Sequence, residues 1–99
     1  MIIVLGSIVA RDGCVSQALQ LSQEHVSRSR AEPGCIAHAV HIDSENPSRL
    51  VFVEKWASQA DLLEHFKVPA SRAFAKALGE LSSEAPSIEL FAASPVSMS

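Results

Sequence analysis

The 99-residue sequence contains no tyrosine, one tryptophan and only two cysteines. Two thiols, Cys14 and Cys35, are too few for a disulfide framework, so we expect both to be reduced. Positive charge is also scarce, because eight lysines and arginines stand against eleven acidic residues and the net charge is −3. Nucleic-acid-binding domains usually carry a basic face, so this composition argues against a nucleic-acid partner.

Several chemical signatures are missing as well. The sequence has no P-loop, dinucleotide-binding glycine motif or serine-hydrolase elbow, which leaves those reactions without support. The four histidines and two cysteines show no metal-ligand spacing, and His38 and His41 would point to opposite faces of one strand, so we predict no metal site. The opening MIIVLGSIVA lacks basic residues and is too short to span a bilayer, so we expect a cytoplasmic protein without membrane contact.

Apolar residues are plentiful, at 47% of the chain, and their spacing predicts one domain over residues 1–99. Apolar runs bounded by turn residues predict strands at 2–9, 35–42, 50–56 and 88–92. Helical spacing is found over 15–30 and again from Ser58, a predicted N-cap, to Leu81. Pro69 either interrupts this second helix or starts another piece of it. Residues 94–99 (SPVSMS) are expected to form a frayed tail.

The predicted order, β-α-β-β-α-β, is that of the ferredoxin-like α+β fold with an antiparallel sheet. Right-handed crossovers place both helices on one face of the sheet, which leaves the other face bare. By alternation the bare face carries apolar residues, namely Cys35, Ala37, Ala39, Val51 and Val53. An apolar exposed sheet indicates an interface, so we predict a homodimer that packs through its sheet faces.

Residues 32–74, EPGCIAHAVHIDSENPSRLVFVEKWASQADLLEHFKVPASRAF, resemble the central part of the antibiotic biosynthesis monooxygenase family. The shared features are PGC at a strand start, a hairpin with an N-P turn, E-x-W at the end of the third strand and S-x-A-F after the next helix. The resemblance implies a dimeric α+β barrel with a cavity between sheet and helices. It implies less about the reaction, because the family includes cofactor-free quinone-forming monooxygenases, haem-degrading enzymes and a signal-molecule isomerase. His38 replaces a frequent family tyrosine, and Ala70 replaces a common second histidine.

In LVFVEKW (50–56), alternation places Glu54 on the same face as Phe52 and Trp56. A buried carboxylate needs a partner or a raised pKa. We interpret Glu54 as a partly buried acid that orients a histidine or arginine on the helix side, with a role as catalytic base as the alternative. Phe52, Trp56 and Phe74 are candidate walls for an aromatic substrate, although Trp56 also suits an ordinary core.

His38, His65 and Arg72 complete the candidate catalytic set with Glu54. Imidazole has an ordinary pKa near ~6.5 and suits acid–base work, but either histidine could instead be a core residue with an internal partner. Arg72 could hold an anionic or quinone oxygen, or it could be a solvated helix residue. We expect His41 at the dimer interface and His25 on the surface.

Three hypotheses follow from these residues and the resemblance. The first is a cofactor-independent monooxygenase that oxidises a small phenolic or quinol-type aromatic with O2. The second is non-oxidative ligand binding or an isomerase-like role in the same cavity, and the third is a dimerisation module without chemistry. A haem-degrading role is less favoured, because those relatives use an asparagine on the first strand, where this chain has Gly6 and Ser7.

Overall fold

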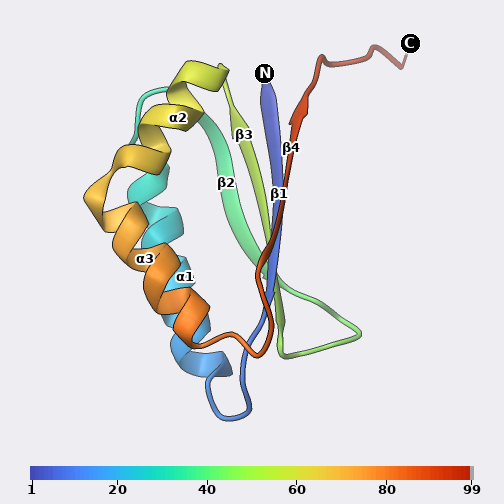
Figure 1. Cartoon of the computed structure of the whole chain (residues 1–99). Helices are drawn as coiled ribbons and strands as arrows, with labels where there is room; N and C mark the ends of the chain where they lie inside the picture. The colour runs from blue at the N-terminus through green and yellow to red at the C-terminus, as the bar shows by residue number, and fades with distance from the viewer. Residues whose placement is uncertain (99) are drawn as a thin grey trace.

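The computed structural model describes residues 1–98. Within this range the order of elements is β1 (Ile2–Val9), α1 (Val15–Ser29), β2 (Cys35–Ile42), β3 (Arg49–Trp56), α2 (Gln59–Lys67), α3 (Pro69–Glu80) and β4 (Ser87–Ala92). The strands form one antiparallel sheet in the order β2-β3-β1-β4. The helices all cover the same face of this sheet (Figure 1). The predicted ferredoxin-like α+β fold is therefore confirmed.

The central strand β3 fixes the face on which the functional residues lie. Its buried residues alternate strictly, as Leu50, Phe52, Glu54 and Trp56. Because successive side chains of a strand point to opposite faces, these four residues all lie on the helix-covered face. The three apolar members of this alternation hold Glu54 under the helices despite its charge.

Two apolar clusters fill the space between sheet and helices. The large cluster joins the sheet to α1 and α3, and its buried members are Ile8, Ala10, Ala18, Val26, Leu50, Phe52 and Leu78. The small cluster lies under α2 and consists of Val4, Trp56 and Leu62, with Ile2 and Cys35 packed against it. On β3, Glu54 stands between Phe52 of the large cluster and Trp56 of the small one. The core is thus divided at the level of Glu54.

Proline separates the second helical stretch into two helices. Pro69 occupies the first turn of α3, where its missing N–H and fixed φ are tolerated. Val68 before it is extended, as residues preceding proline tend to be. At the start of α2, the Ser58 hydroxyl accepts a hydrogen bond from the Asp61 backbone N–H at 3.2 Å, which confirms the predicted N-cap. The break leaves His65 in the last turn of α2.

A β-bulge in β2 changes the faces expected at the start of this strand. Cys35 pairs with Trp56, but Ala37 already pairs with the next β3 residue, Lys55, so Ile36 is an extra residue. Cys35 consequently packs against the small cluster, whereas Ile36 is 57% exposed. The prediction that simple alternation places Cys35 on the bare face was wrong, because a bulge resets the alternation.

The face of the sheet away from the helices carries several apolar residues, together with the exposed charges of Lys55 and Glu89. Leu5 of β1 and Phe91 of β4 are 39% and 45% exposed there, and Val51 and Val53 of β3 are half-buried on the same face. An exposed apolar sheet of this kind is typical of an interface. A homodimer through this face stays a prediction, and His41, which is exposed on the same face, would lie within that interface.

The thiols and the C-terminal segment complete the description. Cys14 and Cys35 are both free. Residues 93–98 contain no helix or strand, and Ser99, the last residue of the predicted tail, lies outside the described residues. No helix among the described residues has the length and apolar character needed to cross a membrane.

Candidate functional site

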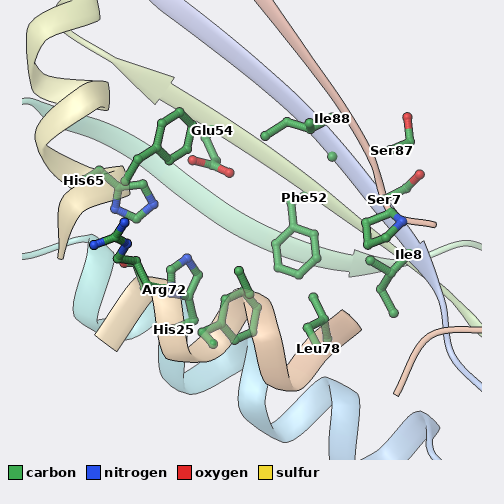
Figure 2. A pocket seen from close by; sticks show the side chains of 16 residues that line it. Ser7, Ile8, His25, Phe52, Glu54, His65, Arg72, Leu78, Ser87 and Ile88 are labelled. Atoms are coloured by element: carbon green, nitrogen blue, oxygen red, sulfur yellow. The ribbon is translucent and has the colours of Figure 1, made fainter. Parts of the chain in front are cut away.

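A cavity of about 290 Å³ opens between the sheet and the helices α2 and α3. Its walls are mainly apolar and include Ile8, Phe52, Phe74, Leu78 and Ile88. Figure 2 shows that Glu54, His65, Arg72 and His25 gather at one end of the cavity, while Ile8 and Leu78 lie at the other. The volume is near the lower limit for small-molecule sites. The space therefore suits a small, mostly apolar ligand with a polar group at one end.

Glu54 anchors the polar end from β3. Its side chain is largely buried, and its Oε1 accepts a hydrogen bond from Trp56 Nε1 at 3.0 Å. His38 Nε2 lies 3.2 Å from the same oxygen, but without the alignment of a hydrogen bond, so this contact is an electrostatic pair. Burial by itself would raise the pKa of Glu54, but His38 and the Trp56 N–H outweigh it and hold the pKa below its usual value. Glu54 is thus a buried carboxylate whose histidine partner is His38.

His38 lies behind the cavity wall and does not border the cavity itself. It is 2% exposed, and neither of its ring nitrogens has a hydrogen-bond partner among the described residues. Its ring lies edge-on to Trp56, with centroids 6.3 Å apart. His38 is therefore placed to act on the cavity only through Glu54 or through neighbouring histidines.

His65 reaches the polar end from the last turn of α2. Its Nδ1 lies 2.9 Å from Glu32 Oε1, and its ring packs on Trp56 with a centroid distance of 4.6 Å. Glu32 lies in the turn before β2 and is not among the residues that the sequence predicts for the site. Because Glu32 occupies Nδ1, the other ring nitrogen, Nε2, is the one left for a ligand in the cavity.

His25 is buried, at 5% exposed, so the prediction of a surface position was wrong. Its ring stacks on Phe74 with centroids 4.0 Å apart and an interplanar angle of 6°. Burial, together with the neighbouring His38 and His65, lowers the pKa of His25 to about 3. The spacing does contain a clue, because Ala18, Ser22, His25 and Ser29 recur at intervals of three and four residues along the buried face of α1.

The three histidines form one group with Glu54, which we call the histidine layer (His25, His38, Glu54 and His65). The ring centroid of His25 lies 5.3 Å from those of both His38 and His65. One ligand nitrogen from each histidine lies within 4.8 Å of the others. The three rings come from α1, β2 and α2, so no spacing within a single element of the sequence could have revealed this group.

Comparison with known proteins identifies the family. The sequence profile of the antibiotic biosynthesis monooxygenase family matches residues 1–77. The chain belongs to this family. Its fold matches that of a Deinococcus radiodurans protein with a TM-score of 0.92 and 23% identity, over 97% of this chain and 95% of that one. Rv0793 of Mycobacterium tuberculosis gives a TM-score of 0.89 and 22% identity, over 96% of each chain.

A longer relative is also found. The protein sll1783 of Synechocystis sp. is 29% identical over 90 residues, which make up 91% of this chain and 61% of the relative. The chain thus spans about three fifths of the length of this relative. Family membership and the shared fold indicate a monooxygenase-like or small-molecule-binding architecture.

The two departures from the usual family pattern can now be placed. Ala70 is exposed in the first turn of α3 and does not border the cavity. His38, at the position of a frequent family tyrosine, belongs to the histidine layer. The polar end of the cavity is formed by His25, Glu54, His65 and Arg72.

Of the remaining predicted site residues, three border the cavity and one is buried in the core. Arg72 borders the cavity from α3, is exposed and forms no ion pair within residues 1–98. Phe52 and Phe74 border it as well, in an edge-to-face arrangement with centroids 6.2 Å apart. Trp56 is fully buried in the small cluster and does not border the cavity. Its contacts suit it to position Glu54 and His65.

Proposed function

We propose that this chain binds a small phenolic or quinol-type aromatic in the cavity and promotes its oxidation by O2. The observation that carries the proposal is the arrangement of an apolar cavity with one polar end made of His25, Glu54, His65 and Arg72. Phe52 and Phe74 provide faces against which an aromatic ring can pack. The size of the cavity suits one or two fused rings and argues against a tetrapyrrole.

The reaction needs no electron donor other than the substrate. A phenol and O2 give a quinone and water: one oxygen atom becomes the new carbonyl, and the other leaves as water with the phenolic proton and the ring hydrogen. The reduction of O2 in this reaction takes four electrons, and the substrate supplies all of them. The protein's part is to ionise the hydroxyl, with His65 as proton acceptor, and to stabilise the phenolate through the Arg72 guanidinium. Glu32 orients His65, and Glu54 with His38 keeps the surrounding rings in place.

Oxygen consumption by the purified protein with a panel of phenols, naphthols and quinols of one or two rings tests this proposal. We expect at least one substrate to be consumed well above the blank rate. Arg72→Gln should lower kcat/KM by about tenfold to a hundredfold, since it removes one group that stabilises the oxyanion. Lys76→Gln is the matched control, because Lys76 is exposed on the same helix and does not border the cavity. Uptake at the blank rate for the entire panel would refute the proposal.

Non-oxidative binding is the second candidate, and the absence of tyrosine together with Ala70 favours it. In that case a ligand should raise Tm without O2 consumption, because binding to the folded state alone stabilises it by about 2.7 kcal/mol at 100 times Kd. Measuring both quantities on the same panel separates the two candidates.

We also propose that the chain acts as a homodimer through its open sheet face, and in the cytoplasm, where free thiols such as Cys14 and Cys35 persist. Leu5→Lys places a charge at the centre of this face and should convert the dimer to a monomer in sedimentation experiments. Leu63→Lys, on the outer side of α2, is the matched control. A wild-type protein that sediments as a monomer would contradict the dimer.

A further inference from the structure

The three buried histidines assemble a site that the oxidation of a phenol does not itself require. His25, His38 and His65 are 5%, 2% and 4% exposed, and one ligand nitrogen of each lies within 4.8 Å of the other two. We propose that these three imidazoles hold a single divalent transition-metal ion at the polar end of the cavity. The proposal concerns binding by the protein alone and stands whether or not the chain oxidises a phenol.

Unpaired nitrogens are the first support for this site. Buried polar atoms nearly always have hydrogen-bond partners, and exceptions call for an explanation. Here His25 Nδ1 and His38 Nδ1 are buried and have no hydrogen-bond partner among the described residues, whereas His38 Nε2 lies 3.2 Å from Glu54 Oε1. A buried imidazole nitrogen without a partner can offer the lone pair that a metal ion takes up.

The outer contacts of the histidines also match those of metal ligands. A metal-bound histidine usually donates its second ring N–H to a carboxylate, a carbonyl or another acceptor. His65 has this arrangement, because its Nδ1 lies 2.9 Å from Glu32 Oε1 and Nε2 is left for the ion. Ser29 Oγ lies 3.5 Å from His25 Nε2, which leaves Nδ1 of that ring for the ion. Figure 2 shows the His25 and His65 rings close together at this end of the cavity.

Charge supports a dication at this place. Two carboxylates, Glu54 and Glu32, adjoin the three imidazoles, at 3.2 Å from His38 and 2.9 Å from His65. A divalent ion held by the imidazoles would offset part of the negative charge of these two carboxylates.

The geometry requires a small closure of the rings. Metal–imidazole bonds are about 2.0–2.1 Å long, so two ligand nitrogens in a tetrahedral site are about 3.4 Å apart. The present separations of up to 4.8 Å would have to shrink by up to about 1.4 Å, through small shifts of the three side chains. Three imidazoles with a fourth position open toward the cavity favour zinc, cobalt, nickel, copper or ferrous iron. Glu54 or a ligand oxygen could occupy the fourth position.

Titration of chelator-stripped, full-length protein with Co²⁺ and Zn²⁺ tests the site. We expect one ion per chain, with the Co²⁺ absorption bands of a tetrahedral nitrogen-rich site in the visible range. His25→Gln, His38→Gln and His65→Gln should each weaken binding at least a hundredfold. His41→Gln is the matched control and should bind normally, because His41 lies on the same strand as His38 but on the opposite face.

Two further measurements distinguish the loss of metal binding from poor folding of a histidine variant. Circular dichroism identifies unfolded variants, and Glu32→Gln, which leaves all three ligands in place, should still weaken binding by about tenfold to a hundredfold. Wild-type protein that takes up no ion, or that binds no more tightly than the three histidine variants, overturns the proposal. Binding is measured without substrate and O2, so failure of the oxidation assay leaves this result standing.

Discussion

The two apolar clusters on the covered face of the sheet differ in size and in the residues that they contain. The large cluster lies under two helices and encloses its residues with aliphatic neighbours. The small cluster has three buried members, and its largest, Trp56, also donates a hydrogen bond to Glu54. Between the clusters lies the histidine layer, where apolar packing would have been equally possible. A buried polar layer seldom adds stability over an apolar core, so its presence here points to function.

The largest expected effect comes from breaking the small cluster. Trp56→Ala should lower the free energy of unfolding by about 4 kcal/mol, because it leaves a cavity that two remaining residues cannot fill and removes the donor to Glu54. Leu78→Ala in the large cluster should cost less, about 3 kcal/mol. Urea denaturation of both variants makes the comparison. A larger loss for Leu78→Ala would show that the small cluster is not the more vulnerable one.

The turn beside the small cluster should be almost as sensitive. Gly34 and Gly13 both have a φ of +79°, so alanine at either position is strained by about 1 kcal/mol. A Cβ at Gly34 would also collide with Asp61, whereas a Cβ at Gly13 meets nothing within 4 Å. We therefore expect a total loss of about 3 kcal/mol for Gly34→Ala, against about 1 kcal/mol for the matched Gly13→Ala. Equal losses in thermal or urea unfolding would rule out the collision as a cause.

Replacing Glu54, which lies between the two clusters, by an apolar residue tests how much its buried pair with His38 contributes to stability. Glu54→Leu should cost about 2 kcal/mol, because it leaves the Trp56 N–H and the His38 ring without their carboxylate. The double variant Glu54→Leu/His38→Leu removes both ends of the buried pair and should recover the part of that loss that comes from His38, while the Trp56 N–H stays without its acceptor. A double-mutant cycle in urea measures the coupling. Strict additivity would mean that Glu54 and His38 do not interact.

The smallest effect concerns Cys35 at the border of the small cluster. Burial, and then the nearby charges of Glu54 and Glu32, raise the pKa of this thiol. In a Cys14→Ser protein, the rate of alkylation by iodoacetamide should therefore rise at a higher pH than for a cysteine in an unfolded peptide. Glu54→Gln removes one negative charge and should move this profile toward lower pH. An unchanged profile would exclude the charge of Glu54 as a cause of the raised pKa.

The sequence predicts the fold well because the fold depends on local periodicity. The alternation of Leu50, Phe52 and Trp56 is enough by itself to predict that Glu54 lies on the covered face. The alternation pattern does not reveal the β-bulge at Ile36, so it assigns Cys35 to the wrong face of the sheet. Local rules fail where the backbone adds a residue without a turn signal.

The site is less completely predictable than the fold. His38, His65 and Glu54 are recognisable because apolar neighbours surround them in the sequence. His25 lies in a helix whose buried stripe consists partly of the small residues Ala18 and Ser22, which give little apolar signal, so the pattern favours a surface position. The pairing of Glu32 with His65 joins residues 33 positions apart, and no local pattern encodes such a contact.

The histidine layer takes one residue from each of four consecutive elements, namely His25 from α1, His38 from β2, Glu54 from β3 and His65 from α2. The contact between His38 and Glu54 needs only the β2–β3 hairpin, in which the two residues pair, whereas the contacts of His25 and His65 need α1 and α2 to dock on the sheet. Contacts that close late are absent from the folding transition state and have φ-values near zero. Substitutions of His25 and His65 should therefore change how fast the native protein unfolds and leave its folding rate nearly unaltered.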